Sequence, residues 1–194
     1  EDVEKTGTAY ARDSRWIQSI FTGVSQQIGA RQLESTLRHD NTSAYGHSNT
    51  YQWGASYQLT EQLQVRLNQG SAFKVPTFND LYWPGFANPT LKPEQSRSRE
   101  AGLRFDLGGV YQWQFDAVHF DRNLTNMIAW NNATFQSENI AAANLHGLEY
   151  SVSATTGLVR HELNATYTEG EDLQSKARVL PNIPRQKYTY VTSL

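Results

Sequence analysis

Aromatic side chains that could bind a bulky ligand are concentrated in one segment, "FKVPTFNDLYWPGFANP" (73–89). Aromatic rings stack on large planar solutes, and a few polar groups fix their orientation. The candidate ligand-binding residues are Tyr82, Trp83, Phe86 and Asn88. The segment can instead be structural, with Phe73, Pro76 and Leu81 folding it back on itself, because a proline holds the residue before it extended. We favour the structural role for Tyr82 as well, and both roles stay open for the other three candidates.

Charged residues of both signs recur on the polar side of alternating segments. They are Arg66, Glu100, Arg104, Glu149, Arg160 and Glu162. Glu100 and Arg104 share one parity, so their carboxylate and guanidinium groups can form an ion pair. Such a pair can bind a moving element reversibly, or it can simply neutralise charge inside the protein. We favour the second interpretation.

Catalytic and metal-binding chemistry has little support in the sequence. The five histidines form neither an HxH nor an HExxH pattern, there is no cysteine, and no GxSxG motif presents a serine nucleophile. The acidic residues Glu169, Glu171 and Asp172 lack EF-hand spacing and are typical of a solvated loop. A net charge of −2 provides no basic surface for nucleic acid. The sequence therefore predicts a protein that is not an enzyme, with no cofactor and no bound metal.

Strands must position these residues, because apolar and polar residues alternate with a period of two along most of the chain. The clearest segments are 51–59, 63–67, 100–107, 111–117, 148–154 and 159–167, and weaker ones are 15–28, 31–39, 118–130 and 185–194. Helical periodicity is poorly supported. We therefore predict an all-β chain of roughly nine or ten strands.

The connections between these strands predict an up-and-down meander. Tight turns at 28–30, 60–62, 107–109 and 155–157 alternate with longer connections at 41–48, 75–97, 123–138 and 169–184. A soluble β-sandwich or lipocalin-like barrel would place the aromatic parity inside, whereas a membrane barrel would turn it to lipid and line its lumen with the polar parity. The polarised loop lengths, the aromatic residues near strand ends and the mixed charges on the polar parity favour the membrane barrel.

Two segments resemble the TonB-dependent outer-membrane receptors. They are "GSAFKVPTFNDLYWPGFANPTLKPEQSRSREAGL" (70–103) and "ENIAAANLHGLEYSV" (138–152). Together with "LPNIPRQKY" (180–188), their order and spacing resemble the branch of this family that takes up cobalamin (vitamin B12) in Gram-negative bacteria.

The resemblance implies an antiparallel transmembrane β-barrel with tight periplasmic turns and long extracellular loops. Residues 1–194 would form part of one barrel domain, without the plug domain and the C-terminal strands. The implied partners are cobalamin or another large scarce nutrient, TonB through the plug, and outer-membrane lipid, with the six charged candidates lining the lumen. A siderophore or haem receptor is the alternative within the family. A soluble binding module and an outer-membrane barrel enzyme are the alternatives outside it.

Overall fold

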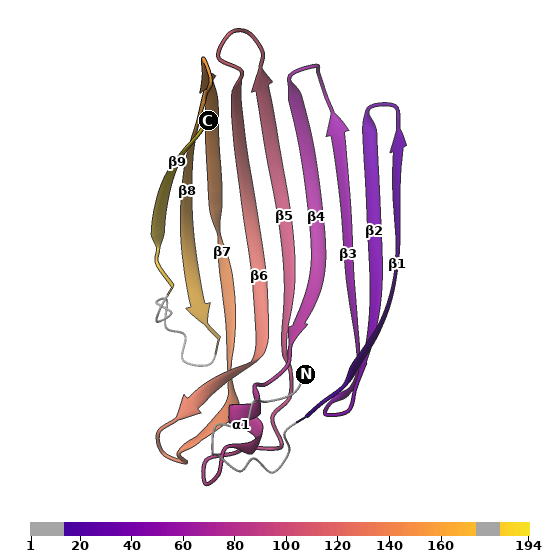
Figure 1. The fold of residues 1–194 in the computed structure, drawn as a ribbon, viewed down its shortest axis with the longest axis vertical. Helices are drawn as coiled ribbons and strands as arrows, with labels where there is room; N and C mark the ends of the chain where they lie inside the picture. The colour runs from indigo at the N-terminus through magenta and orange to yellow at the C-terminus, as the bar shows by residue number, and fades with distance from the viewer. Residues whose placement is uncertain (1–13, 174–182) are drawn as a thin grey trace.

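In the part of the chain that the structure describes, nine antiparallel strands form one sheet in which spatial order follows chain order (Figure 1). This computed structural model describes residues 14–173 and 183–194. Each strand pairs with the next, so β1 and β9 are the two edges of the sheet. The elements are β1 (Ile17–Ile28), β2 (Arg31–Thr42), β3 (Gly46–Gln58), β4 (Leu63–Lys74), α1 (Phe78–Tyr82), β5 (Glu94–Leu107), β6 (Trp113–Asn131), β7 (Gln136–Thr156), β8 (Val159–Asp172) and β9 (Gln186–Ser193).

The two ends of the sheet differ in their connections. The turns that join β1 to β2, β3 to β4, β5 to β6 and β7 to β8 lie at one end, and α1 lies at the other (Figure 1). Gly29 and Gly157 turn the chain with φ angles of 57° and 62°, a backbone region that glycine enters without steric cost. The four predicted tight turns are confirmed. Among the described residues, no helix has the length and apolar character needed to cross a membrane.

Two connections that the sequence predicts to be long are short. β2 continues to Thr42 and β3 begins at Gly46, so only three residues separate them within the predicted 41–48 connection. Likewise, β6 ends at Asn131 and β7 begins at Gln136, so both strands reach into the predicted 123–138 connection. The predicted connection at 75–97 is confirmed, since residues 75–93 join β4 to β5 and contain α1. The connection predicted at 169–184 lies partly outside the described residues.

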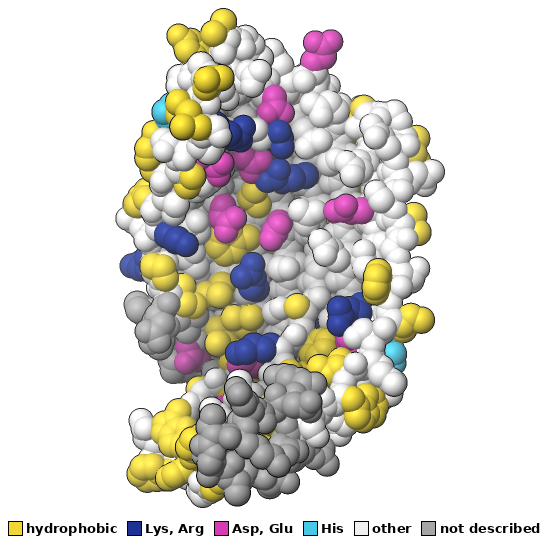
Figure 2. Space-filling model, in the orientation of Figure 1, with side chains coloured by type: hydrophobic (Ala, Val, Ile, Leu, Met, Phe, Trp, Pro, Cys, Tyr) yellow, Lys and Arg dark blue, Asp and Glu magenta, His cyan; other side chains and the backbone are white. Residues whose placement is uncertain are grey.

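The two faces of the sheet carry different side chains. Leu103 on the apolar parity is 52% exposed, whereas Val118 and Phe120 on the opposite parity are only 9% and 7% exposed. Side chains converge on the concave side of a curved sheet and diverge on its convex side, so the polar parity lines the concave face. Figure 2 shows this face, with Lys, Arg, Asp and Glu gathered along its middle and hydrophobic side chains along its margins and between the charged residues in its lower half. The apolar parity therefore faces outward, as in a membrane barrel and opposite to a soluble sandwich.

Candidate functional site

The six charged candidates all lie on the concave face, and the structure spreads them over four strands rather than one cluster. Arg66 on β4 reaches over β5 to Asp116 on β6, where the guanidinium makes two hydrogen bonds, one of 2.7 Å from Nη1 to Oδ2. Gly102 on β5 lies beneath this pair, and an added Cβ there would stand 2.9 Å from Arg66 Nε. Because Gly102 has no side chain, the Arg66 side chain can cross β5 and reach Asp116.

The predicted ion pair between Glu100 and Arg104 is wrong. Arg104 Nε instead donates to Asp106 Oδ2 at 3.0 Å, two residues along the same strand. Four residues of a strand span about 13 Å and two span about 7 Å, so only the nearer carboxylate is within reach. Both partners of the observed pair are at least 40% exposed, and such surface pairs contribute only about 0–1 kcal/mol.

The candidates on β7 and β8 have local partners or face open space. Arg160 Nη2 donates to Ser153 Oγ at 3.0 Å, and Glu162 accepts a hydrogen bond of 2.9 Å from Asn164. Glu149 is exposed on the concave face, with Val118 and Thr166 as its cross-strand neighbours. Its carboxylate is therefore accessible from the concave side of the sheet.

A third charge cluster, on β1 and β2, was missed by the sequence reasoning. Arg38 Nε donates to Asp40 Oδ2 at 2.9 Å, and Ser19 Oγ donates to the other carboxylate oxygen. Asp40 is fully buried, so these bonds replace the water that its charge would otherwise require. The sequence does contain a sign of this cluster, because Arg38 and Asp40 stand two residues apart and therefore on the same side of a strand.

The aromatic segment folds around α1, which begins with a reciprocal cap. Thr77 Oγ1 accepts a hydrogen bond from the backbone of Asp80, whose carboxylate accepts one of 3.1 Å from the backbone N–H of Thr77. This T-x-x-D cap is the signal from which the short helix could have been predicted. Below it, Phe78, Leu81 and Leu91 are buried together with Pro76, so the segment does fold back over the strand ends.

Asp80 also ties the segment to β7. Ser137 Oγ donates to Asp80 Oδ1 at 2.8 Å. Burial alone would raise the pKa of Asp80, but the hydrogen bonds from Thr77 and Ser137 outweigh it and hold the pKa below its ordinary value. The ionised Asp80 carboxylate therefore holds both the start of α1 and the start of β7 by hydrogen bonds.

The four candidate ligand-binding residues divide into two groups. Asn88 donates to the Ser137 carbonyl at 2.9 Å and accepts from Thr90, so its side chain serves the loop itself. The Tyr82 ring packs against Phe78, with ring centroids 6.0 Å apart. Trp83 and Phe86 remain 40% and 46% exposed. These two rings are the ones that stay accessible to a ligand.

One aromatic partner of this group comes from elsewhere in the sequence. The Phe86 ring lies 6.1 Å from that of Trp130 on β6, which is 49% exposed. Trp130 belongs to a segment predicted as a weak strand followed by a long loop, so its position beside Phe86 was not predictable. In the part of the chain that the structure describes, no group of His, Asp and Glu side chains could hold a metal ion.

Comparison with known proteins decides the family. The profile described as "TonB dependent receptor-like, beta-barrel" matches residues 4–193. The chain belongs to the TonB-dependent receptors. The resemblance found in its sequence is thereby confirmed, and its strands are those of the family's outer-membrane β-barrel.

Similar sequences carry the name vitamin B12 transporter BtuB. The protein from Photobacterium profundum is 33% identical over 180 residues, which cover 89% of this chain and 29% of that protein. The protein from Vibrio vulnificus strain YJ016 is 32% identical over 164 residues, covering 82% and 26%. The chain thus spans less than a third of the length of these curated relatives.

Similar solved structures confirm the fold. The siderophore receptor PirA from Acinetobacter baumannii superposes with a TM-score of 0.74 at 18% identity, over 99% of this chain and 34% of that one. The ferric-catecholate import receptor Fiu from E. coli K12 gives a TM-score of 0.73 at 17% identity, over 92% and 32%.

Proposed function

We propose that this chain forms part of the barrel wall of an outer-membrane transporter that takes up cobalamin in a Gram-negative bacterium, with TonB acting through a plug domain. The observation that carries the proposal is that curated relatives at 30–33% identity over more than four fifths of the chain carry the name vitamin B12 transporter, as those from Photobacterium profundum, Vibrio vulnificus and Vibrio cholerae do. The siderophore receptors resemble the chain at under 25% identity, which supports a common fold and no common substrate.

In this proposal the two parts of the site have separate roles. Trp83 and Phe86 sit on the loop end of the barrel, where exposed rings can stack on a large planar solute before it enters. The six charged candidates line the lumen, where they offer hydrogen-bonding groups to a plug that moves. No covalent bond is made or broken, because transport needs only binding and displacement.

The test is a titration of the full-length receptor, purified in detergent, with cyanocobalamin and in parallel with ferric siderophores. We expect submicromolar binding of cyanocobalamin, measured by isothermal calorimetry. Tight siderophore binding without cobalamin binding would replace the substrate assignment by the alternative within the family. A Trp83→Ala substitution is expected to weaken cobalamin binding about tenfold if its ring stacks on the ligand. Tyr111→Ala, at the opposite end of the sheet, is the matched control.

A further inference from the structure

On β4 to β8 the outward face changes from apolar to polar near one level of the sheet. On β4 the change falls between Leu67 and Gln69, and on β5 between Ala101 and Arg99. These positions are direct cross-strand neighbours, since Leu67 pairs with Ala101 and Gln69 pairs with Arg99. The outward positions of β6, β7 and β8 change nearby, at His119, His146 and Glu169. This level marks where the hydrocarbon of a surrounding bilayer would end.

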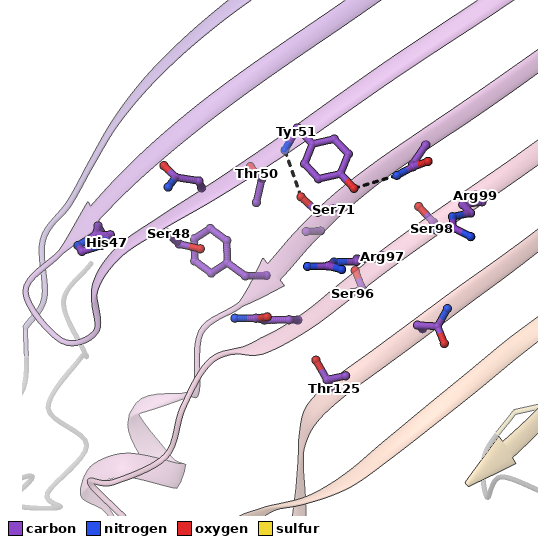
Figure 3. Close-up of a pocket in the computed structure, with 16 residues that line it drawn as sticks. His47, Ser48, Thr50, Tyr51, Ser71, Ser96, Arg97, Ser98, Arg99 and Thr125 are labelled. Atoms are coloured by element: carbon purple, nitrogen blue, oxygen red, sulfur yellow. Dashed lines mark hydrogen bonds between the residues drawn. The ribbon is translucent and has the colours of Figure 1, made fainter. Parts of the chain in front are cut away.

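A hollow of about 720 Å³ opens just beyond this boundary, toward the α1 end (Figure 3). It exists because β3 and β4 part, their ladder ending at the pair Gln52 and Gly70 while both strands continue. Tyr51 closes one margin of the hollow, since its backbone N–H donates to Ser71 Oγ at 3.1 Å and its hydroxyl accepts from Gln69 at 3.0 Å. We call this space the arginine hollow, after Arg97 and Arg99 in its lining.

The lining of the arginine hollow favours an anion. It contains Arg97, Arg99 and His47 and no aspartate or glutamate, and most other lining side chains are hydroxyls and amides. Both arginines are exposed and lie on one outward parity of β5, about 7 Å apart along the strand. Within the described residues, neither arginine forms a hydrogen bond or an ion pair, and neither is among those with further contacts.

Within the described residues, no carboxylate at this level forms an ion pair with either arginine. Asp121 lies opposite Arg99 across the ladder, but its carboxylate accepts from Asn123 at 3.0 Å and from Asn144 at 3.2 Å. Further along the sheet, Glu169 has His146 and Arg185 within 3.5 Å. Among the described residues of the outward face, Glu169 on β8 therefore has cationic partners, whereas Arg97 and Arg99 on β5 form no ion pair.

We propose that the arginine hollow binds the phosphate groups of a lipid headgroup at the outer surface of the membrane. A guanidinium presents a planar fork of N–H donors that matches a phosphate in two parallel hydrogen bonds. Two such forks at the edge of the hydrocarbon can hold phosphates while the acyl chains lie along Leu67, Ala101 and Leu103. The inference rests on the membrane location of the proposed function and not on its substrate.

The experiment measures lipid binding to the full-length receptor in a neutral detergent by native mass spectrometry. The probes are phosphatidic acid, phosphatidylcholine and inorganic phosphate. We expect the receptor to prefer phosphatidic acid to phosphatidylcholine, and the double variant R97Q/R99Q to lose this preference by about tenfold, since charge-assisted bonds to phosphate are lost. The variant R97K/R99K keeps both positive charges but lacks the planar guanidinium. Its preference for phosphatidic acid is expected to lie between that of the unmodified receptor and that of R97Q/R99Q.

The matched control is Arg122→Gln, because Arg122 lies at the same level on the opposite, concave face. An equal loss in this variant would show unspecific charge attraction and overturn the proposal. Full competition by inorganic phosphate would point to a soluble anion and overturn the lipid assignment. Cyanocobalamin binding by R97Q/R99Q is expected to stay unchanged, so a failure of the lipid proposal is distinguishable from a failure of the transport proposal.

Discussion

At the scale of single residues, the largest loss of stability is expected from a substitution of Gly147. A Cβ added there would lie 2.0 Å from the Tyr167 carbonyl oxygen and 2.8 Å from the Phe120 ring. The carbonyl belongs to the neighbouring strand and cannot move aside without breaking the ladder. Gly147→Ala is therefore expected to destabilise the barrel by about 2–4 kcal/mol, in the range of severe overpacking. The measurement is the urea midpoint of the full-length barrel in phospholipid vesicles.

Gly108→Ala is the control for this prediction, because nothing lies within 4 Å of a Cβ at Gly108 and its φ is ordinary. Its urea midpoint should match that of the unmodified protein. An equally stable Gly147→Ala variant would mean that β7 and β8 are further apart than the structure places them.

Two of the arginine–aspartate pairs on the concave face, Arg66–Asp116 and Arg104–Asp106, are expected to differ in strength. Arg66 and Asp116 are 29% and 16% exposed, whereas Arg104 and Asp106 are 40% and 46% exposed. Water screens the second pair more, so a double-mutant cycle should give a coupling energy of about 1–2 kcal/mol for the first pair and under about 0.5 kcal/mol for the second. The cycles use Arg→Gln and Asp→Asn in vesicle unfolding. Equal coupling energies would contradict this ranking.

At the scale of elements, the α1 connection is expected to respond to acid. The pKa of Asp80 is lower in the folded protein than in the unfolded chain, so its contribution to stability is complete above the unfolded pKa and is lost as pH falls through the folded pKa. Hydrogen exchange of the peptide covering residues 77–91 should therefore accelerate as pD falls below about 4, the ordinary range of an aspartate, after correction for the intrinsic rate. Asp80→Asn should remove this dependence.

Glu61→Gln is the matched control for the acid response, because Glu61 is an exposed carboxylate in the turn between β3 and β4. This variant should keep the acceleration seen in the unmodified protein. If Asp80→Asn keeps it as well, another group controls the loop.

The strands that the sequence predicted least well show why period-two patterns fail. Inside the apolar belt, Leu67 and Leu103 contrast with their polar neighbours, so the period is visible. Around Asn49 on β3 both faces are polar, so the alternation disappears although the strand continues. On β6 a register shift between Leu124 and Met127 breaks the alternation within the strand. The strand ends at 41–48 and 123–138 were therefore mistaken for long loops.

The sequence predicted which face of the sheet each candidate residue lies on, but not which residues it contacts. Parity placed Arg66, Glu149 and the other charged candidates on one face, and the structure agrees. The actual partners depend on the register between strands and on gaps such as Gly102, neither of which is encoded in a single strand. The meeting of Phe86 with Trp130 is likewise set by the loop and not by local sequence.

At the scale of the whole molecule, the two edges of the sheet carry the last prediction. Among the strands that the structure describes, β1 and β9 each have a neighbour on one side only, so each presents a row of backbone groups unpaired within the described sheet. A bilayer offers no hydrogen bonds to such groups, and an exposed edge in water pairs with other chains. The 22.0 kDa chain in detergent, on its own, is therefore expected to associate through its edges. Light scattering after size exclusion measures this, and a stable monomer would show that β1 and β9 close on each other into a smaller barrel, in which Arg66 and Arg104 would crowd a narrower lumen.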